Sequence, residues 1–148
     1  MLGVWTVSLV SFGVSAQSSP PVCSTTTTII TNSGPITLGA DRECLQINSG
    51  GTVTGSFVAV RNLSVQDVQI TNQGTINGST GIFANVGASI SSITNSGSIS
   101  GNLYGIDNDG TITTVTNNAS GLISGEIAGI LNRSNAQMRE IENRGGPH

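Results

Sequence analysis

Few side chains in this sequence could support acid–base or metal chemistry, and their spacing does not gather them. The segment Asp107-Asn108-Asp109-Gly110 comes closest to a motif, because it resembles part of an oxygen-rich calcium loop. A full loop would need another acid at Gly105 and a bidentate Glu downstream, so we interpret the segment as a turn. The single histidine, His148, is the last residue, which leaves a serine nucleophile without a positioned base. We predict no catalytic, cofactor-binding or metal-ligating residue.

Polysaccharide cleavage is the enzymatic alternative, because it needs two carboxylates that meet across one groove. On a repeating fold these carboxylates would come from the same phase of neighbouring repeats. At the phase of Asp107, however, the other repeats carry Arg61, Ala84 and Leu131. We therefore expect a protein that is not an enzyme.

The composition disfavours several classes of protein. Only 9% of the residues are charged and 3% are aromatic, whereas Gly, Ser, Thr and Asn are abundant. Five Lys and Arg residues against eight Asp and Glu, with a net charge of -3, offer no basic footprint for nucleic acid. A disordered polar linker is the alternative to a folded chain. It is disfavoured because β-branched residues recur at a fixed phase.

Two short phrases set the period of the chain. The first ends in glycines that lie 23, 23 and 24 residues apart, at Gly55, Gly78, Gly101 and Gly125. The second ends in asparagines with the same spacing, at Asn62, Asn85, Asn108 and Asn132. Between them, short alternating runs of Ile and Val predict strands with one buried face.

The positions between these strands favour turns. Glycines such as Gly74, Gly78, Gly81 and Gly87 tolerate positive φ and are expected to turn the chain there. No segment has enough helix-forming residues in helical phase to supply crossover helices. We predict an all-β fold, a parallel, right-handed β-helix (solenoid) with coils of about 23 residues.

Stacking such coils places side chains in columns. Three apolar columns are predicted, made of Ile47, Ile70, Ile93, Val115 and Ile141; of Val53, Ile76, Ile99 and Ile123; and of Val60, Ile82, Ile106 and Ile130. A fourth contains Ile90, Ile112 and Met138. Its first position falls on Asp67, so either the register shifts to use Val65 and Val68 or that corner is open.

Asparagines are predicted to form two further columns. One contains Asn62, Asn85, Asn108 and Asn132, and the other contains Asn48, Asn72 and Asn95. Side-chain amides stacked at the spacing of strands can hydrogen-bond to each other along the stack. We interpret them as structural residues.

The start of the chain indicates export. Residues 1–16 are apolar and end in Val14-Ser15-Ala16, small residues that a signal peptidase favours, so we predict a signal peptide cleaved after Ala16. An ordinary buried strand is the alternative.

Cys23 and Cys44 are the only two cysteines, which predicts a disulfide formed in an oxidising compartment. Two unpaired buried cysteines are the alternative. We assign residues 17–46 to an N-terminal cap that contains the disulfide, and residues 47–148 to the β-helix repeats. The last repeat stops after residue 145 where another phrase is expected, so we interpret the chain as truncated at its C-terminus. A bare strand edge there predicts self-association.

The repeats from Ile93 to Gly101, followed by Tyr104-Gly105-Ile106-Asp107-Asn108, resemble the passenger domains of bacterial autotransporters. These are type V secretion proteins of Gram-negative outer membranes, and the resemblance extends over about residues 29–145. It implies a signal peptide, a right-handed β-helical passenger that crosses the periplasm to the cell surface, and a C-terminal outer-membrane β-barrel. This sequence has no pattern of such a barrel, so it resembles an N-terminal fragment.

Two functions are therefore expected. The first is a secreted or cell-surface stalk and adhesion module that contacts host or neighbouring-cell surface components and needs no cofactor. The alternative is a polysaccharide-binding or polysaccharide-cleaving β-helix. With Phe57, Phe83 and Tyr104 as the aromatic residues of the coils, the platform for stacking sugars is thin.

Overall fold

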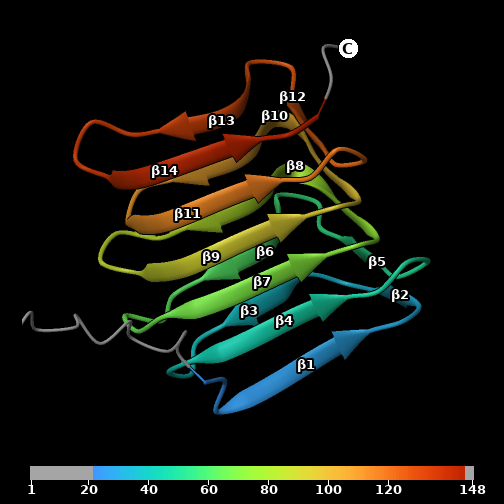
Figure 1. Ribbon diagram of the computed structural model, residues 1–148, viewed down its shortest axis with the longest axis horizontal. Helices are drawn as coiled ribbons and strands as arrows, with labels where there is room; N and C mark the ends of the chain where they lie inside the picture. The colour runs from blue at the N-terminus through green and yellow to red at the C-terminus, as the bar shows by residue number, and fades with distance from the viewer. Residues whose placement is uncertain (1–21, 146–148) are drawn as a thin grey trace, which may run out of the picture.

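A computed structural model describes residues 22–145, and this part of the chain is a parallel β-solenoid without helices (Figure 1). Its first face is a six-stranded parallel sheet with one strand from each successive coil. In stacking order the strands are β1 (Thr25–Ile29), β4 (Glu43–Ile47), β7 (Val68–Asn72), β9 (Ser89–Asn95), β11 (Thr111–Asn117) and β14 (Gln137–Asn143). We call this sheet face 1.

The other strands form a second sheet that bends into two further faces. Face 2 contains β2 (Asn32–Ser33), β5 (Thr52–Thr54), β12 (Leu122–Gly125) and the first halves of β8 (Thr75–Ala84) and β10 (Ser98–Asn108). Face 3 contains β3 (Ile36–Leu38), β6 (Val58–Asn62), β13 (Ala128–Asn132) and the second halves of β8 and β10. A shift in register between Gly101 and Tyr104 marks the bend in β10.

The chain winds in a right-handed sense. In Figure 1 the strands of face 1 run to the right at the front, and the return strands run to the left behind them as the colour climbs from blue to red. Paired residues such as Ile76 and Ile99 lie one coil apart in the sequence. The predicted fold class, an all-β parallel solenoid with coils of about 23 residues, is confirmed.

The interior is filled by the predicted apolar columns. The columns that contain Ile76 and Ile82 are in register throughout, and both side chains are completely buried. The fourth column begins with Val68, which pairs with Ile90 beside a shift in register. The register therefore shifts through Val68, while Val65 is 66% exposed. Each buried Ile or Val contributes roughly 1.5–3 kcal/mol, so a continuous column stabilises the stack.

The first predicted column is wrong at its lowest position. Leu45, not Ile47, pairs with Ile70, and Ile47 instead pairs with Asn72. The reason is the two-residue alternation of a strand: Ile70 and Asn72 both point inward and are two residues apart. Leu45 and Ile47 have this spacing, whereas the predicted pair of Ile47 and Asn48 does not.

The same alternation removes Asn85 from its predicted column. Ile82 pairs with Ile106, so Ala84 pairs with Asn108, and Asn62 on the other side also pairs with Ala84. The phase of Asp107 is corrected in the same way, because Phe83 rather than Ala84 is its partner in β8.

Asparagine amides form one continuous ladder at the corner that follows face 1. The Nδ2 atoms donate to the next Oδ1 from Asn72 to Asn95 (2.8 Å), from Asn95 to Asn117 (2.8 Å) and from Asn117 to Asn143 (3.0 Å). Asn48, which was predicted to belong here, does not. At the corner that follows face 3 only Asn108 donates to another asparagine, Asn132, at 2.7 Å.

Most glycines at the corners serve close packing rather than positive φ, contrary to the prediction. Of the described glycines, Gly50 and Gly87 have positive φ, of 92° and 77°. A Cβ on Gly81 would lie 2.6 Å from the carbonyl oxygen of Gly105, and one on Gly74 would overlap the carbonyl oxygen of Gly51. The coils stack so closely at these points that only glycine fits.

The predicted disulfide joins Cys23 and Cys44, whose Cα atoms are 5.7 Å apart. It attaches the segment before β1 to β4, the next strand of face 1. The predicted signal peptide, residues 1–16, lies outside the described residues, as do residues 17–21 of the predicted cap and residues 146–148.

Candidate functional site

The candidate site lies on the outer surface of face 3. Side chains that follow the inward-facing Ile and Val residues must point outward, because a strand alternates. From the first described coil to the last, these paired outward residues are Thr37, Arg61, Phe83, Asp107 and Leu131. These residues form one outward column of face 3.

Asp107 is held by a bidentate ion pair. Arg133, at the corner after β13, donates from Nε to Oδ1 at 2.8 Å and from Nη2 to Oδ2 at 2.7 Å. These hydrogen bonds raise the pKa of the Arg133 guanidinium further above its usual range. Asp107 is only 3% exposed, so its carboxylate is covered by the pair. This carboxylate is engaged in structure rather than presented to a substrate.

The segment interpreted as a turn is partly strand. Asp107 and Asn108 are the last residues of β10, and their side chains point to opposite sides. Asp107 points toward Arg133, and Asn108 points toward Asn132. Asp109 and Gly110 make the bend that follows. Within residues 22–145 no group of three His, Cys, Asp or Glu side chains is placed to hold a metal ion.

Phe83 lies between two guanidinium groups. The Cζ atom of Arg61 is 5.7 Å from the ring centroid, and that of Arg133 is 6.0 Å from it. Arg133 has a carboxylate partner, whereas Arg61 forms no ion pair with the part of the chain that the structure describes. The cluster therefore carries an unneutralised positive charge at Arg61, whose guanidinium is oriented by the aromatic ring.

A groove adjoins Arg61 on the outside of β3 and β6. Its volume is about 390 Å³, and Thr37, Ser56, Phe57 and Arg61 are among the residues that line it. Phe57 is 80% exposed, so most of its side chain is accessible to a ligand in the groove. The groove combines a cation, an aromatic face and hydroxyl groups, and this set of groups suits non-covalent binding.

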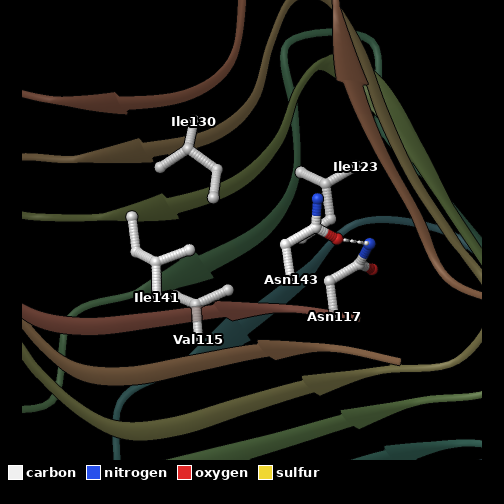
Figure 2. A pocket seen from close by; sticks show the side chains of 6 residues that line it. All are labelled: Val115, Asn117, Ile123, Ile130, Ile141 and Asn143. Atoms are coloured by element: carbon white, nitrogen blue, oxygen red, sulfur yellow. Dashed lines mark hydrogen bonds between the residues drawn. The ribbon is translucent and has the colours of Figure 1, made fainter. Parts of the chain in front are cut away.

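A second cavity, of about 140 Å³, opens at the last described coil (Figure 2). Figure 2 shows Ile123, Ile130 and Ile141 pointing into it from the three faces, with the hydrogen bond between Asn117 and Asn143 at one side. Ile141 is 54% exposed. These residues continue the interior columns, so the cavity is the top of the core.

Residues 22–145 contain no helix long and apolar enough to cross a membrane. Comparisons of the chain with protein-family models, with curated proteins and with solved structures find no match.

No binding residue was predicted from the sequence, and Arg61, Phe83 and Phe57 were missed. The alternation of the strands contained a usable signal for two of them. Arg61 and Phe83 each follow an inward residue of the same column, so their stacking on one outer face could have been predicted. The groove around Phe57 depends on how the bend between faces 2 and 3 packs, for which the sequence has no signal.

Proposed function

We propose that this chain is part of a β-helical passenger of the autotransporter type, which acts at the cell surface or in the medium as a stalk and adhesion module. The observation that carries the proposal is a rigid stack of coils whose outward positions are mostly uncharged and polar. On face 1, for example, one outward column reads Thr28, Gln46, Thr71, Thr94, Thr116 and Glu142, of which only the last is charged. Such a surface suits many weak contacts along a rod.

The disulfide supports an extracellular role. A disulfide between Cys23 and Cys44 persists in oxidising compartments such as the periplasm or the outside of the cell. The proposed partners are components of host or neighbouring-cell surfaces, and a longer parent would supply an outer-membrane β-barrel. We propose no catalytic activity and no nucleic-acid partner.

Export and adhesion can be tested separately. The gene would be expressed from its own start codon in a Gram-negative host, and the chain would be followed by fractionation and by its accessibility to added protease. The purified chain, immobilised on beads, would then be offered to epithelial and bacterial cells. We expect export with an oxidised disulfide and retention of beads on at least one cell type. A chain that stays reduced in the cytoplasm, or beads that bind no better than uncoated beads, would contradict the proposal.

A polysaccharide-binding β-helix is the second candidate, favoured by the groove that Phe57 and Arg61 line. A polysaccharide-cleaving protein is less well supported, because the carboxylate of Asp107 is paired with Arg133. Incubation with polysaccharides and measurement of new reducing ends would separate binding from cleavage.

A further inference from the structure

We propose that the groove beside Arg61 binds a carboxylated sugar unit of a surface glycan or polysaccharide. The inference rests on the proposed adhesion function and deepens it by naming the class of ligand.

The charge of the groove selects an anionic group. Two guanidinium groups flank Phe83, but only that of Arg133 is neutralised within the described residues, by Asp107. The remaining cation, Arg61, lines the groove. A guanidinium group binds a carboxylate through two parallel hydrogen bonds, and stacking on an aromatic ring holds it in place beforehand. The group that reaches Arg61 should therefore be an anion, and a carboxylate fits the planar guanidinium in this way.

The size of the groove and its exposed ring select a sugar. The volume of about 390 Å³ falls within the range of small-molecule sites, roughly 300–1,000 Å³. Phe57, 80% exposed, presents an aromatic ring in the groove. The negative face of such a ring attracts the weakly positive C–H groups of a sugar ring. A small anion would leave this ring uncovered, and a neutral sugar would leave Arg61 unpaired.

The remaining polar groups of the groove match sugar hydroxyls. Thr37 is the strand partner of Arg61 in the coil below, and Ser56 precedes Phe57. Both residues line the groove, and the hydroxyl of each can donate and accept hydrogen bonds. Carboxylate, flat C–H face and hydroxyls occur together in a carboxylated sugar such as a uronic acid.

The test uses the whole chain and a matched pair of probes. Binding of tetragalacturonate and of its methyl ester, which has the same rings without the charge, would be measured by calorimetry at low and high salt. We expect the acid to bind about tenfold or more tighter than the ester, because only the acid can form a charged hydrogen-bonded pair with Arg61. We also expect this affinity to fall as salt screens the charge.

Variants locate the site. Arg61→Gln and Phe57→Ala should each weaken binding of the acid about tenfold, whereas Arg139→Gln, an exposed arginine on β14, should not change it. Arg61→Lys, which keeps the charge but not the planar group, should fall between the wild type and Arg61→Gln. Melting temperatures of all variants would show that the fold is intact.

Several outcomes would overturn the proposal. Equal affinity for the acid and its ester, or unchanged affinity in Arg61→Gln, would remove the role of the carboxylate. Acetate or a poly-glutamate peptide that competes as well as tetragalacturonate would show a general anion site. If no carboxylated sugar, with sialyllactose included beside lactose, binds better than its neutral counterpart, the proposed ligand class is wrong.

Failure of this proposal is distinguishable from failure of the adhesion function. If Arg61→Gln beads adhere as well as wild-type beads, adhesion stands and the ligand class falls. If the chain binds carboxylated sugars in solution but is never exported, the site stands and the surface role falls.

Discussion

The two corners that flank face 1 both turn the chain onto the next face, but their asparagine side chains bond in different ways. At the first corner, after face 1, β7 and β9 are each followed by a two-residue turn and β11 by a four-residue turn, yet Asn72, Asn95 and Asn117 all belong to the continuous ladder. At the second corner, after face 3, the turns vary in length as well, but there Ala84 interrupts the asparagines. Both corners expose apolar side chains, with Ile30 66% exposed at the first and Val86 71% exposed at the second.

The difference shows that the ladder depends on which residue points inward in each coil rather than on the length of the turn. Where every coil presents an asparagine, the amides hydrogen-bond from coil to coil, even where the turn after Asn117 is longer than the others. Where one coil presents Ala84 instead, the neighbouring amide has no side-chain partner and bonds to the backbone. Asn62, for example, donates to the carbonyl oxygen of Ser89 at 3.0 Å and accepts from the backbone N–H of Ser64 at 3.0 Å.

The largest effect should come from breaking the core that both corners share. Ile99 is completely buried in the second apolar column, so Ile99→Asp would place an unpaired charge there. We expect a loss of about 5 kcal/mol or more and cooperative unfolding of the array. Thr75→Asp, on an outward position of face 2, should change stability by about 0.5 kcal/mol or less. Urea unfolding followed by circular dichroism checks this, and similar midpoints for the two variants would contradict the register.

The next largest effect should separate the corners by their glycines. A Cβ on Gly97 would overlap the carbonyl oxygen of Gly74, so Gly97→Ala should lower the unfolding free energy by about 3 kcal/mol. A Cβ on Gly87, at the second corner, would meet no atom within 4 Å, but the backbone there has a φ of 77°. Gly87→Ala should therefore lower the unfolding free energy by only about 1–2 kcal/mol. Thermal melts of both variants compare the packing effect with the backbone effect. A larger loss of stability in Gly87→Ala than in Gly97→Ala would show that the first corner can relax.

A smaller effect should come from the amides themselves. Asn95 is completely buried and bonds to Asn72 and Asn117, so Asn95→Ala should lower the unfolding free energy by about 2 kcal/mol. Asn62, equally buried but bonded only to backbone groups, is the matched control. Asn62→Ala should lower the unfolding free energy by about 1 kcal/mol. Equal losses in denaturant titrations would mean that the coil-to-coil amide bonds add nothing.

The smallest effect should be a gain. Ala84→Asn would place an amide between Asn62 and Asn108 and complete the second column of asparagines. We expect the unfolding free energy to rise by about 1 kcal/mol, because the new amide gains an asparagine amide as a hydrogen-bond partner on each side. Ala84→Leu, which adds bulk without polar atoms, should instead destabilise, because no hydrogen bond offsets the overpacking. If both variants melt below the wild type, the corner has no room for a ladder.

Much of this architecture could be predicted from the sequence, and some errors could have been avoided. The repeat period, the all-β class, the columns of Ile76 and Ile82, and the disulfide followed from spacing and residue type. The misplacement of Ile47 and of Asn85 also had a remedy in the sequence. Inward residues are two apart in a strand, and neither Ile47 with Asn48 nor Ile82 with Asn85 has the spacing of its neighbours.

Repetition alone thus determined that this protein is a solenoid, because residues that recur at one period must stack and bury the same side in every coil. Only the tertiary structure decided what the corners and the outer surface do. The partner of Asp107 is Arg133, 26 residues away on another coil, and the groove beside Arg61 is built by residues of two coils. Such contacts depend on how turns of unequal length fold over the stack, and a turn that breaks the period leaves no periodic signal in the sequence.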